Sequence, residues 1–600
     1  MEEVKKIKNR DEISQEYKWN IEAIYNSTTD WEKSFSRLKE MAPKLSTYSG
    51  KLANSKDLLE FLNLREETFR LSGTLSVYTN MKMDEDTGNS TFQGLKDRFD
   101  TYFSELLSMD AFFIPEILSL GEDVINKLLE ETPDLRMYRF FFDKILREKP
   151  HTLTKEKEEL LAFMSDALYA PEKIYSMLSD ADMKFPNIKD ENGNDVELSE
   201  ANYISYLNSK DRRVRKDAFD TLFGVYYNFK NTIAASLSSA MKNLVLNGKI
   251  RNYSSSLEAS LKPNSIPVDV YSNLIDTINK NLKSLHRYVR IKKKLLGLDE
   301  IHMYDLYVPL IELPEENVDY NHGLKLVREG LTPLGDEYMG ILNEGISNGW
   351  VDVYPNRNKR SGAYSTGNYD TMPYILLNFD NTLDDAFTLA HELGHSIHSY
   401  YSNENQPYIY SNYSLFCAEV ASTTNENLLV SHLIDKETDK NKKLYLINQE
   451  IENIRTTIFR QVMFAEFERM THATLERGES LTAEDLCKMW HDLNVKYYGP
   501  DMIVDEKIDI EWARIPHFYW NFYVYQYATG YAAAYSFANK ILNKEHNAVE
   551  LYKGFLKSGD SNYPIEVLKN AGVDMTTSKP IEDTIRRFEE LMDMLEERSC

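Results

Sequence analysis

The sequence predicts a mostly α-helical fold with a small β-sheet beside one central helix. Through most of the first 180 residues, apolar side chains recur three and four positions apart, as they do on the buried face of an α-helix. The runs 124–129 and 159–164 are typical of this pattern, whereas strand patterns are few. Because 600 residues exceed a single hydrophobic core, we expect at least two lobes.

Two short segments favour strands. The first surrounds Asn192-Gly193, a pair that favours a tight hairpin between Phe185 and Val196. The second, 372–379, is apolar and directly precedes the central helix. The sequence leaves two positions in a sheet possible for the segment 372–379. One is an edge, where its unpaired backbone groups would take up an extended peptide, and the other is an ordinary interior strand.

The charge excludes some classes of partner. A formal net charge of −25 argues against a nucleic-acid surface and against binding to anionic membranes. It either favours the approach of cationic or neutral peptides or merely keeps the protein soluble. No apolar run reaches the length of about 18 residues that a membrane span requires, so we expect no membrane segment.

The cysteines and the N-terminus indicate a cytoplasmic protein. The three cysteines, Cys417, Cys487 and Cys600, cannot form a disulfide framework. The first residues lack the apolar core of a signal peptide. The cytoplasm is therefore the simplest location.

The most informative motif is the stretch 391–395, in which two histidines lie four residues apart. His391 and His395 would share one face of a helix, with Glu392 beside the first imidazole. Two neutral imidazoles placed in this way can hold one Zn²⁺ while the glutamate reaches a metal-bound water. Histidine is scarce, at 12 in 600 residues. The motif therefore favours a zinc-dependent peptide hydrolase over a solvated helix face with two unrelated histidines.

The residues around this motif predict the helix that it needs. Thr382 can cap the helix start, and Asp385, three residues on, can reach back to the cap. We expect the helix to run to about residue 401 and to stop in the polar run that ends at Pro407. Both histidines then lie inside the helix.

A catalytic zinc site needs a third protein ligand, and the next helical pattern, from about 412 to 434, offers one. Glu419 lies among small and apolar residues, where a buried carboxylate needs a partner, either zinc or an arginine or lysine. Glu426, two turns further on, either orients a ligand by hydrogen bonding or is simply solvated. Cys417 is better explained as a small buried side chain than as a fourth ligand, because a thiolate would close the water position.

Glu419, Ser422 and Glu426, spaced three and four apart after the two-histidine helix, resemble the metallopeptidases of the thimet oligopeptidase and oligoendopeptidase F group. The closer resemblance is to oligoendopeptidase F, and it extends along nearly the whole chain. The other segments that carry it are 17–20 with 24–25 and Trp31, 212–215 with 218–219, 360–364 with 378–379, and 515–519 through 529–530.

The combined motifs predict a zinc endopeptidase with one Zn²⁺ per chain, bound by His391, His395 and Glu419. The metal lowers the pKa of its water and polarises the substrate carbonyl. Glu392 then takes the water proton and hands it to the leaving amine. The resemblance implies a further histidine and one or more tyrosines that contact substrate and stabilise the transition state.

His517 matches the family motif for that histidine. For the tyrosines we favour Tyr523 and Tyr527, which would lie four apart on one helix face. Most other tyrosines nearby are expected in the core or along amphipathic walls. His398 points off the metal face of its helix and is expected to be structural.

The resemblance also implies two helical lobes around a deep substrate channel, which would admit only short peptides. It favours the edge position for the strand at 372–379. Pattern and resemblance together place an N-terminal helical lobe at 1–200, with a possible boundary near 115, and a catalytic domain at 201–600. Two other readings are a zinc carboxypeptidase, which would need a cationic group for the substrate's carboxylate, and a peptide-binding protein with a vestigial metal site.

Overall fold

The computed structural model describes residues 7–311 and 317–599. Helices dominate this part of the chain and the sheets are small, so the predicted fold class is confirmed. None of the helices formed by these residues combines the length and the hydropathy needed to cross a bilayer. Contacts group the residues into two compact units, each assembled from three stretches of sequence. These units group residues by contacts and do not define domains that fold independently. The predicted boundary at residue 200, between an N-terminal lobe and a catalytic domain, therefore stays a prediction.

The first unit comprises the described residues of Met1–Lys149, Glu315–Leu433 and Phe537–Val573. Its elements are α1 (Thr28–Leu45), α2 (Ser55–Glu85), α3 (Ser90–Asp110), α4 (Phe113–Glu131), α5 (Arg139–Arg147), α13 (Tyr320–Leu331), α14 (Gly335–Ser347), α15 (Leu383–Asn405), most of α16 (Leu415–Lys436), α21 (Ala548–Lys557), α22 (Pro564–Asn570), β4 (Val351–Asp352), β5 (Tyr364–Thr366) and β6 (Tyr374–Leu376).

The second unit comprises the described residues of Pro150–Pro314, Ile434–Ser536 and Asp574–Cys600. Its elements are α6 (Lys155–Ser176), α7 (Glu200–Leu207), α8 (Arg212–Asn228), α9 (Lys230–Ile250), α10 (Ser256–Leu261), α11 (Val268–Lys280), α12 (Leu282–Leu295), α17 (Lys440–Ile454), α18 (Gln461–Glu476), α19 (Ala483–Tyr498), the first part of α20 (Tyr525–Leu542), α23 (Lys579–Ser599), β1 (Asn187–Lys189), β2 (Asp195–Glu197), β3 (Ile301–His302) and β7 (Met502–Ile503).

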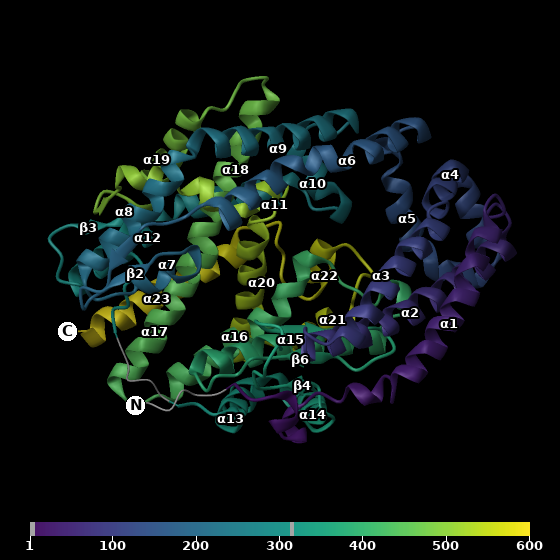
Figure 1. The fold of residues 1–600 in the computed structure, drawn as a ribbon, viewed down its shortest axis with the longest axis horizontal. Coiled ribbons are helices and arrows are strands. Elements are labelled where there is room, and N and C mark those ends of the chain that lie inside the picture. The colour runs from purple at the N-terminus through teal and green to yellow at the C-terminus, as the bar shows by residue number, and fades with distance from the viewer. Residues whose placement is uncertain (1–6, 312–316, 600) are drawn as a thin grey trace. The chain divides into compact units, whose positions relative to one another are not determined.

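The sheet of the first unit has the strand order β4-β6-β5 and lies against α15 (Figure 1). Strand β4 is parallel to β6, with Val351 opposite Ile375, and β5 is antiparallel to β6, with Ser365 opposite Ile375. The expected edge position of this segment is therefore wrong, because β6 is the interior strand. The neighbouring strands are only two and three residues long, which is too short for an alternating apolar and polar pattern to predict them. The edge beside α15 is β5.

A hydrophobic core joins the N-terminal helices to this sheet. It contains Trp19, Trp31 and both Tyr374 and Leu376 of β6, each almost wholly buried. The ring of Trp19 meets that of Tyr374 edge-on at 6.4 Å, and its indole N–H donates to Glu85 at 2.8 Å. The N-terminal segment thus packs behind the strand that supports α15.

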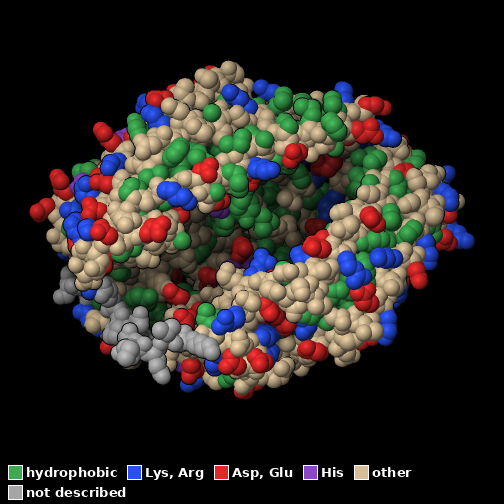
Figure 2. Space-filling model, in the orientation of Figure 1, with side chains coloured by type: hydrophobic (Ala, Val, Ile, Leu, Met, Phe, Trp, Pro, Cys, Tyr) green, Lys and Arg blue, Asp and Glu red, His purple; other side chains and the backbone are tan. Residues whose placement is uncertain are grey.

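In the second unit, the hairpin predicted around Asn192-Gly193 is confirmed, with Ile188 opposite Val196. Helix α6 packs against α9, but much of its apolar pattern faces solvent. Leu160 is 58% and Phe163 is 90% exposed. Figure 2 shows hydrophobic side chains at the surface over these two helices. The periodicity predicts the helix correctly here without marking a buried face.

Candidate metal centre

Helix α15 begins at the cap that the sequence predicts. The hydroxyl of Thr382 accepts the N–H of Asp385 at 3.2 Å, and the Asp385 carboxylate accepts the N–H of Thr382 at 2.9 Å. The helix runs one turn further than expected, to Asn405. It therefore carries His391 and His395 one turn apart on one face, well away from both ends.

Three side chains bring their donor atoms together, and they are the three that the sequence predicts as metal ligands. The Nε2 atoms of His391 and His395 are 3.2 Å apart. Oε2 of Glu419 lies 3.4 Å from the first and 3.5 Å from the second. A tetrahedral site with metal–ligand bonds of about 2.0–2.1 Å has edges of about 3.3–3.4 Å. The donor set and its spacing therefore fit one zinc-sized cation.

The meeting of the two helices depends on a glycine. A Cβ added to Gly394 would lie 2.5 Å from Cα of Ser422 and 2.8 Å from the carbonyl oxygen of Ala421. Those are backbone atoms of α16, which cannot give way as a flexible side chain would. The amide of Asn425 also donates to the carbonyl of Ala390 at 3.0 Å. This close packing brings Glu419 of α16 to the histidines of α15.

Two polar side chains of α16 hold the ligands in orientation. Oε1 of Glu426 lies 2.5 Å from Nδ1 of His391, so Nδ1–H donates to it and Nε2 is left for a metal. The hydroxyl of Ser422 donates to the carboxylate of Glu419 at 3.1 Å. The orienting contact expected of Glu426 is thus present. Glu419 itself is less buried than expected, because its side chain is 42% exposed.

The electrostatics of the cluster favour a positive charge. Burial raises the pKa of the Glu392 carboxyl above its ordinary range, although the neighbouring histidines lower it. Burial alone would lower the pKa of His391, but the bond to Glu426 and nearby carboxylates raise it to about 9. The bond to His395 is the main cause that lowers the pKa of Glu419 to about 2. These carboxylates thus attract a cation to the histidines.

His398 and Cys417 stay out of the cluster, as predicted. His398 is buried, and its ring stacks on Tyr413 at 3.8 Å. Cys417 is a free buried thiol whose pKa burial raises to about 12. Among the described residues, the three-donor cluster contains neither of them. Cys487 is also free, and Cys600 lies outside the described residues.

The predicted substrate-contacting side chains lie together in the second unit. Oη of Tyr527 is 3.3 Å from Nε2 of His517, and the ring of Tyr523 lies 5.9 Å from that of His517 and 5.5 Å from that of Tyr527. The expectation that both tyrosines share a helix face is wrong. Helix α20 begins at Tyr525, so Tyr523 belongs to the preceding turn.

The sequence did not predict two structural features near the proposed functional residues. Trp520, 42% exposed, joins the aromatic group, with its ring 4.8 Å from that of His517 and 5.5 Å from that of Tyr523. The available signal in the sequence was a tryptophan three residues after the predicted substrate-contacting histidine. Strand β5 is tied to α15 through the Ser365 and Ser396 hydroxyls, 2.8 Å apart. That contact joins segments 31 residues apart, so no local signal exists for it.

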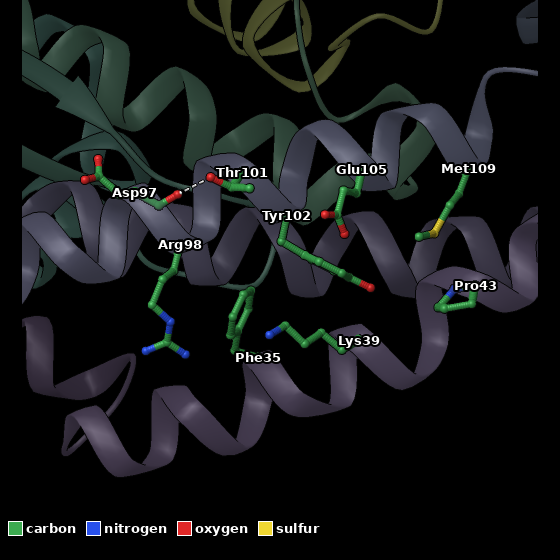
Figure 3. Close-up of a pocket in the computed structure, with 9 residues that line it drawn as sticks. All are labelled: Phe35, Lys39, Pro43, Asp97, Arg98, Thr101, Tyr102, Glu105 and Met109. Atoms are coloured by element: carbon green, nitrogen blue, oxygen red, sulfur yellow. Dashed lines mark hydrogen bonds between the residues drawn. The ribbon is translucent and has the colours of Figure 1, made fainter.

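A separate hollow of about 660 Å³ lies between α1 and α3 (Figure 3). Its aromatic floor includes Phe35 and Tyr102, with the Lys39 ammonium 4.3 Å from the centre of the Phe35 ring. The Thr101 hydroxyl, among its lining groups, donates to the backbone of Asp97 at 2.8 Å. The nine lining residues include none of the three metal-site donors, so this hollow adds nothing to the candidate centre.

Comparison with known proteins identifies the family of the chain. The profile of peptidase family M3 matches residues 205–587, and a profile described as oligopeptidase F matches residues 116–185. The chain belongs to peptidase family M3. This M3 protein is 47% identical to oligopeptidase PepF of Bacillus subtilis, over 98% of the chain and 88% of PepF. It is 39% identical to the group B oligopeptidase PepB of Streptococcus agalactiae, over 98% of each.

Among solved structures, the oligoendopeptidase F of Enterococcus faecium matches this M3 peptidase with a TM-score of 0.74 and 38% identity. The match covers 95% of this chain and 99% of the other. Since M3 proteins are metallopeptidases, the protein is a hydrolase that cleaves peptides with the help of a metal.

Proposed function

We propose that this protein is a zinc endopeptidase that hydrolyses internal bonds of short oligopeptides. The observation that carries the proposal is the triangle of donor atoms from His391, His395 and Glu419, with edges of 3.2, 3.4 and 3.5 Å. Two imidazole nitrogens and one carboxylate oxygen are a donor set that zinc takes in peptidases, with a further position left for water. Family M3 membership supports the same reaction class.

A zinc ion held by these residues would supply a Lewis acid and a water of lowered pKa. The protein's own part in the first step falls to Glu392, which is 7% exposed and adjacent in sequence to His391. Its carboxylate accepts the proton of the attacking water and then donates that proton to the leaving amine. The raised pKa of Glu392 suits this double role, because the base must also become an acid.

The developing oxyanion needs hydrogen-bond donors besides the metal. The family resemblance implies a histidine and tyrosines in this role, and we assign His517, Tyr523 and Tyr527 to substrate contact on that ground. Burial lowers the pKa of His517, so its imidazole stays neutral at physiological pH and donates one N–H. The contact between His517 and the Tyr527 hydroxyl links two of these groups.

Strand β5 is the proposed binding edge for the peptide backbone. It pairs with β6 on one side, and among the described residues no strand pairs with its other side. Backbone pairing along β5 would bind peptides with little side-chain selectivity. We propose further that the substrates are short and unfolded. Comparable cleavage rates for a folded protein and a ten-residue peptide would refute this.

The remaining proposals concern organisation and location. We propose an N-terminal helical lobe at 1–200 and a peptidase domain at 201–600, supported by the two profiles, which end at residue 185 and begin at residue 205. We propose the cytoplasm as the location, supported by the free thiols of Cys417 and Cys487.

The deciding experiment is hydrolysis of an end-blocked, internally quenched peptide by enzyme as isolated, after chelation, and after addition of one equivalent of Zn²⁺, Co²⁺ or Mn²⁺. We expect activity to disappear on chelation and to return with zinc. Blocked ends exclude exopeptidase action, so cleavage would establish an endopeptidase. No cleavage with zinc bound in the chain would refute the proposal.

A further inference from the structure

The segment between His517 and Tyr527 contains a strained residue. Phe522 has φ = 53°, in the left-handed region that residues other than glycine and asparagine rarely adopt. Such a conformation is strained and persists only where the surroundings hold it. The side chain of Phe522 is 1% exposed. Something in the second unit must therefore fix this turn.

The group that fixes it is a buried carboxylate. Oε1 of Glu468, in α18, accepts the backbone N–H of Phe522 at 2.7 Å. Glu468 is wholly buried, and its second oxygen has no hydrogen-bond partner among the described residues. A charged carboxyl group that makes one protein contact in an apolar interior carries a large desolvation penalty. Burial accordingly raises the pKa of Glu468 well above its ordinary range.

Neighbouring groups hold the same turn from other directions. The hydroxyl of Ser260 donates to the carbonyl of Asn521 at 2.8 Å. The ring of Phe522 lies 4.5 Å from that of His472 and meets that of Tyr271 edge-on at 5.6 Å. His472 is one helical turn after Glu468, so α18 presents both side chains to the turn.

Backbone bonds carry this fixed point to the proposed substrate-contacting residues. The N–H of Trp520 donates to the carbonyl of His517, and the N–H of Tyr523 donates to that of Trp520, both at 2.9 Å. The N–H of Tyr527 donates to the carbonyl of Val524 at 3.3 Å. The positions of the His517 and Tyr527 side chains therefore depend on the conformation at Phe522, which lies between them.

We propose that Glu468 is a positioning residue for catalysis, which sets the His517, Tyr523 and Tyr527 side chains by holding the Phe522 N–H. Glu468 is wholly buried and is not one of the three donors of the metal centre. The inference rests on the proposed roles of those three side chains. It goes beyond those roles by assigning a function to a carboxylate that belongs neither to the metal centre nor to the group formed by those three side chains.

The test compares Glu468→Ala with Glu468→Gln. The alanine variant leaves the Phe522 N–H without an acceptor, and we expect kcat to fall about 100-fold with KM changed less than about threefold, since misplaced donors weaken the transition state more than the ground state. The glutamine variant keeps a carbonyl oxygen in the same place and is close in shape to a protonated glutamate. We expect it to restore kcat to within about threefold of the wild type. Both should bind one zinc per chain.

Glu466→Ala is the matched control for lost stability. Glu466 lies on the same helix and is also buried, but it bonds to Lys496 at 2.7 Å and Tyr497 at 2.9 Å rather than to the turn. We expect this variant to lower the melting temperature without the large loss in kcat. A kcat loss in Glu468→Ala no larger than in Glu466→Ala, or no rescue by Glu468→Gln, would overturn the inference.

A double variant separates this inference from the proposed function. If Glu468 acts through His517, then Glu468→Ala should reduce kcat much less in a His517→Ala background than in the wild type. Fully additive losses would overturn the inference while leaving the role of His517 intact. Full activity of His517→Ala and of Tyr527→Phe would refute the roles of those side chains, and the inference with them.

Discussion

Nδ1 of His391 lies 2.5 Å from Oε1 of Glu426, so the carboxylate fixes both the tautomer and the direction of the imidazole. The other ring nitrogen then faces His395 at 3.2 Å and Glu419 at 3.4 Å. One residue of α16 thereby orients a proposed ligand of α15, while another residue of α16 is itself the third proposed ligand. The two helices form the centre jointly.

Glu426→Ala should weaken zinc affinity about 10- to 100-fold, because the imidazole loses its orienting partner. With zinc in excess, most of the activity should return, since the ligands and Glu392 remain. Competition with a chromophoric chelator measures the affinity. Glu404→Ala, at an exposed position of the same α15, is the control and should bind zinc normally. Unchanged affinity in Glu426→Ala would show that the contact has no orienting effect.

Glu392→Gln and Glu419→Gln should separate catalysis from metal binding. The first removes the base but no ligand, so we expect a full zinc content and a loss of kcat of about 10²–10⁴-fold or more. The second weakens a ligand, so we expect a clear loss of zinc affinity. Metal analysis and peptide hydrolysis on the same preparations decide the matter. A parallel loss of metal and activity in Glu392→Gln would make Glu392 a ligand or a structural residue instead.

Gly394→Ala should damage the centre without touching a donor atom. The added methyl group would lie 2.5 Å from Cα of Ser422, so α16 must move away from α15. We expect a loss of about 1–3 kcal/mol in the free energy of unfolding and weaker zinc binding. Gly340→Ala is the matched control, because nothing lies within 4 Å of its added Cβ. In helix α14 that change should be neutral or stabilising by up to about 1 kcal/mol.

The outcome for Gly394→Ala is measured by urea unfolding and by chelator competition. Equal stability and equal zinc affinity of the two alanine variants would contradict the close approach of the helices at Gly394.

Tyr527→Phe should lower kcat by about 10²-fold while leaving zinc content unchanged, since it removes one proposed oxyanion donor. His517→Ala should do the same. Because their polar atoms are 3.3 Å apart, the double variant should lose less than the product of the two single losses. Steady-state kinetics on a blocked peptide provide the test, and an effect on KM alone would indicate ground-state binding rather than transition-state stabilisation.

Local signals predict the metal helix well. The cap formed by Thr382 and Asp385 lies within four residues, and the histidine spacing lies within five, so both can be read from the chain without knowledge of the fold. Glu419 is also predictable as a donor, because it lies in the next helical pattern. Its exposure is not, because exposure depends on what packs beside α16.

Structural features that depend on contacts between distant segments could not be predicted from the sequence. Strand β6 becomes an interior strand only because residues 351–352 and 364–366 pair with it. Tyr523 lies outside helix α20 because the chain turns at Phe522, whose positive φ no propensity indicates. The acceptor that holds this turn, Glu468, is 54 residues away. In each case the deciding partner comes from tertiary packing, which a pattern along one segment cannot contain.

His472 should make the protein less stable in mild acid. Burial lowers the pKa of its imidazole to about 3, whereas an unfolded chain titrates near about 6.5. Between these values only the unfolded state takes up the proton, so the free energy of unfolding falls as the pH drops below about 6.5. The loss is about 1.4 kcal/mol per pH unit, or about 2 kcal/mol by pH 5.

His472→Gln cannot take up this proton and should therefore lose less stability than the wild type between pH 7.5 and 5.0. Urea midpoints of both proteins at the two pH values measure the difference, and the carboxylates that titrate elsewhere contribute equally to each. His322→Gln, at an exposed position of α13, is the control and should follow the wild type. If the stability of His472→Gln falls as much as that of the wild type, the buried imidazole of His472 must be protonated in the folded protein as readily as in the unfolded chain.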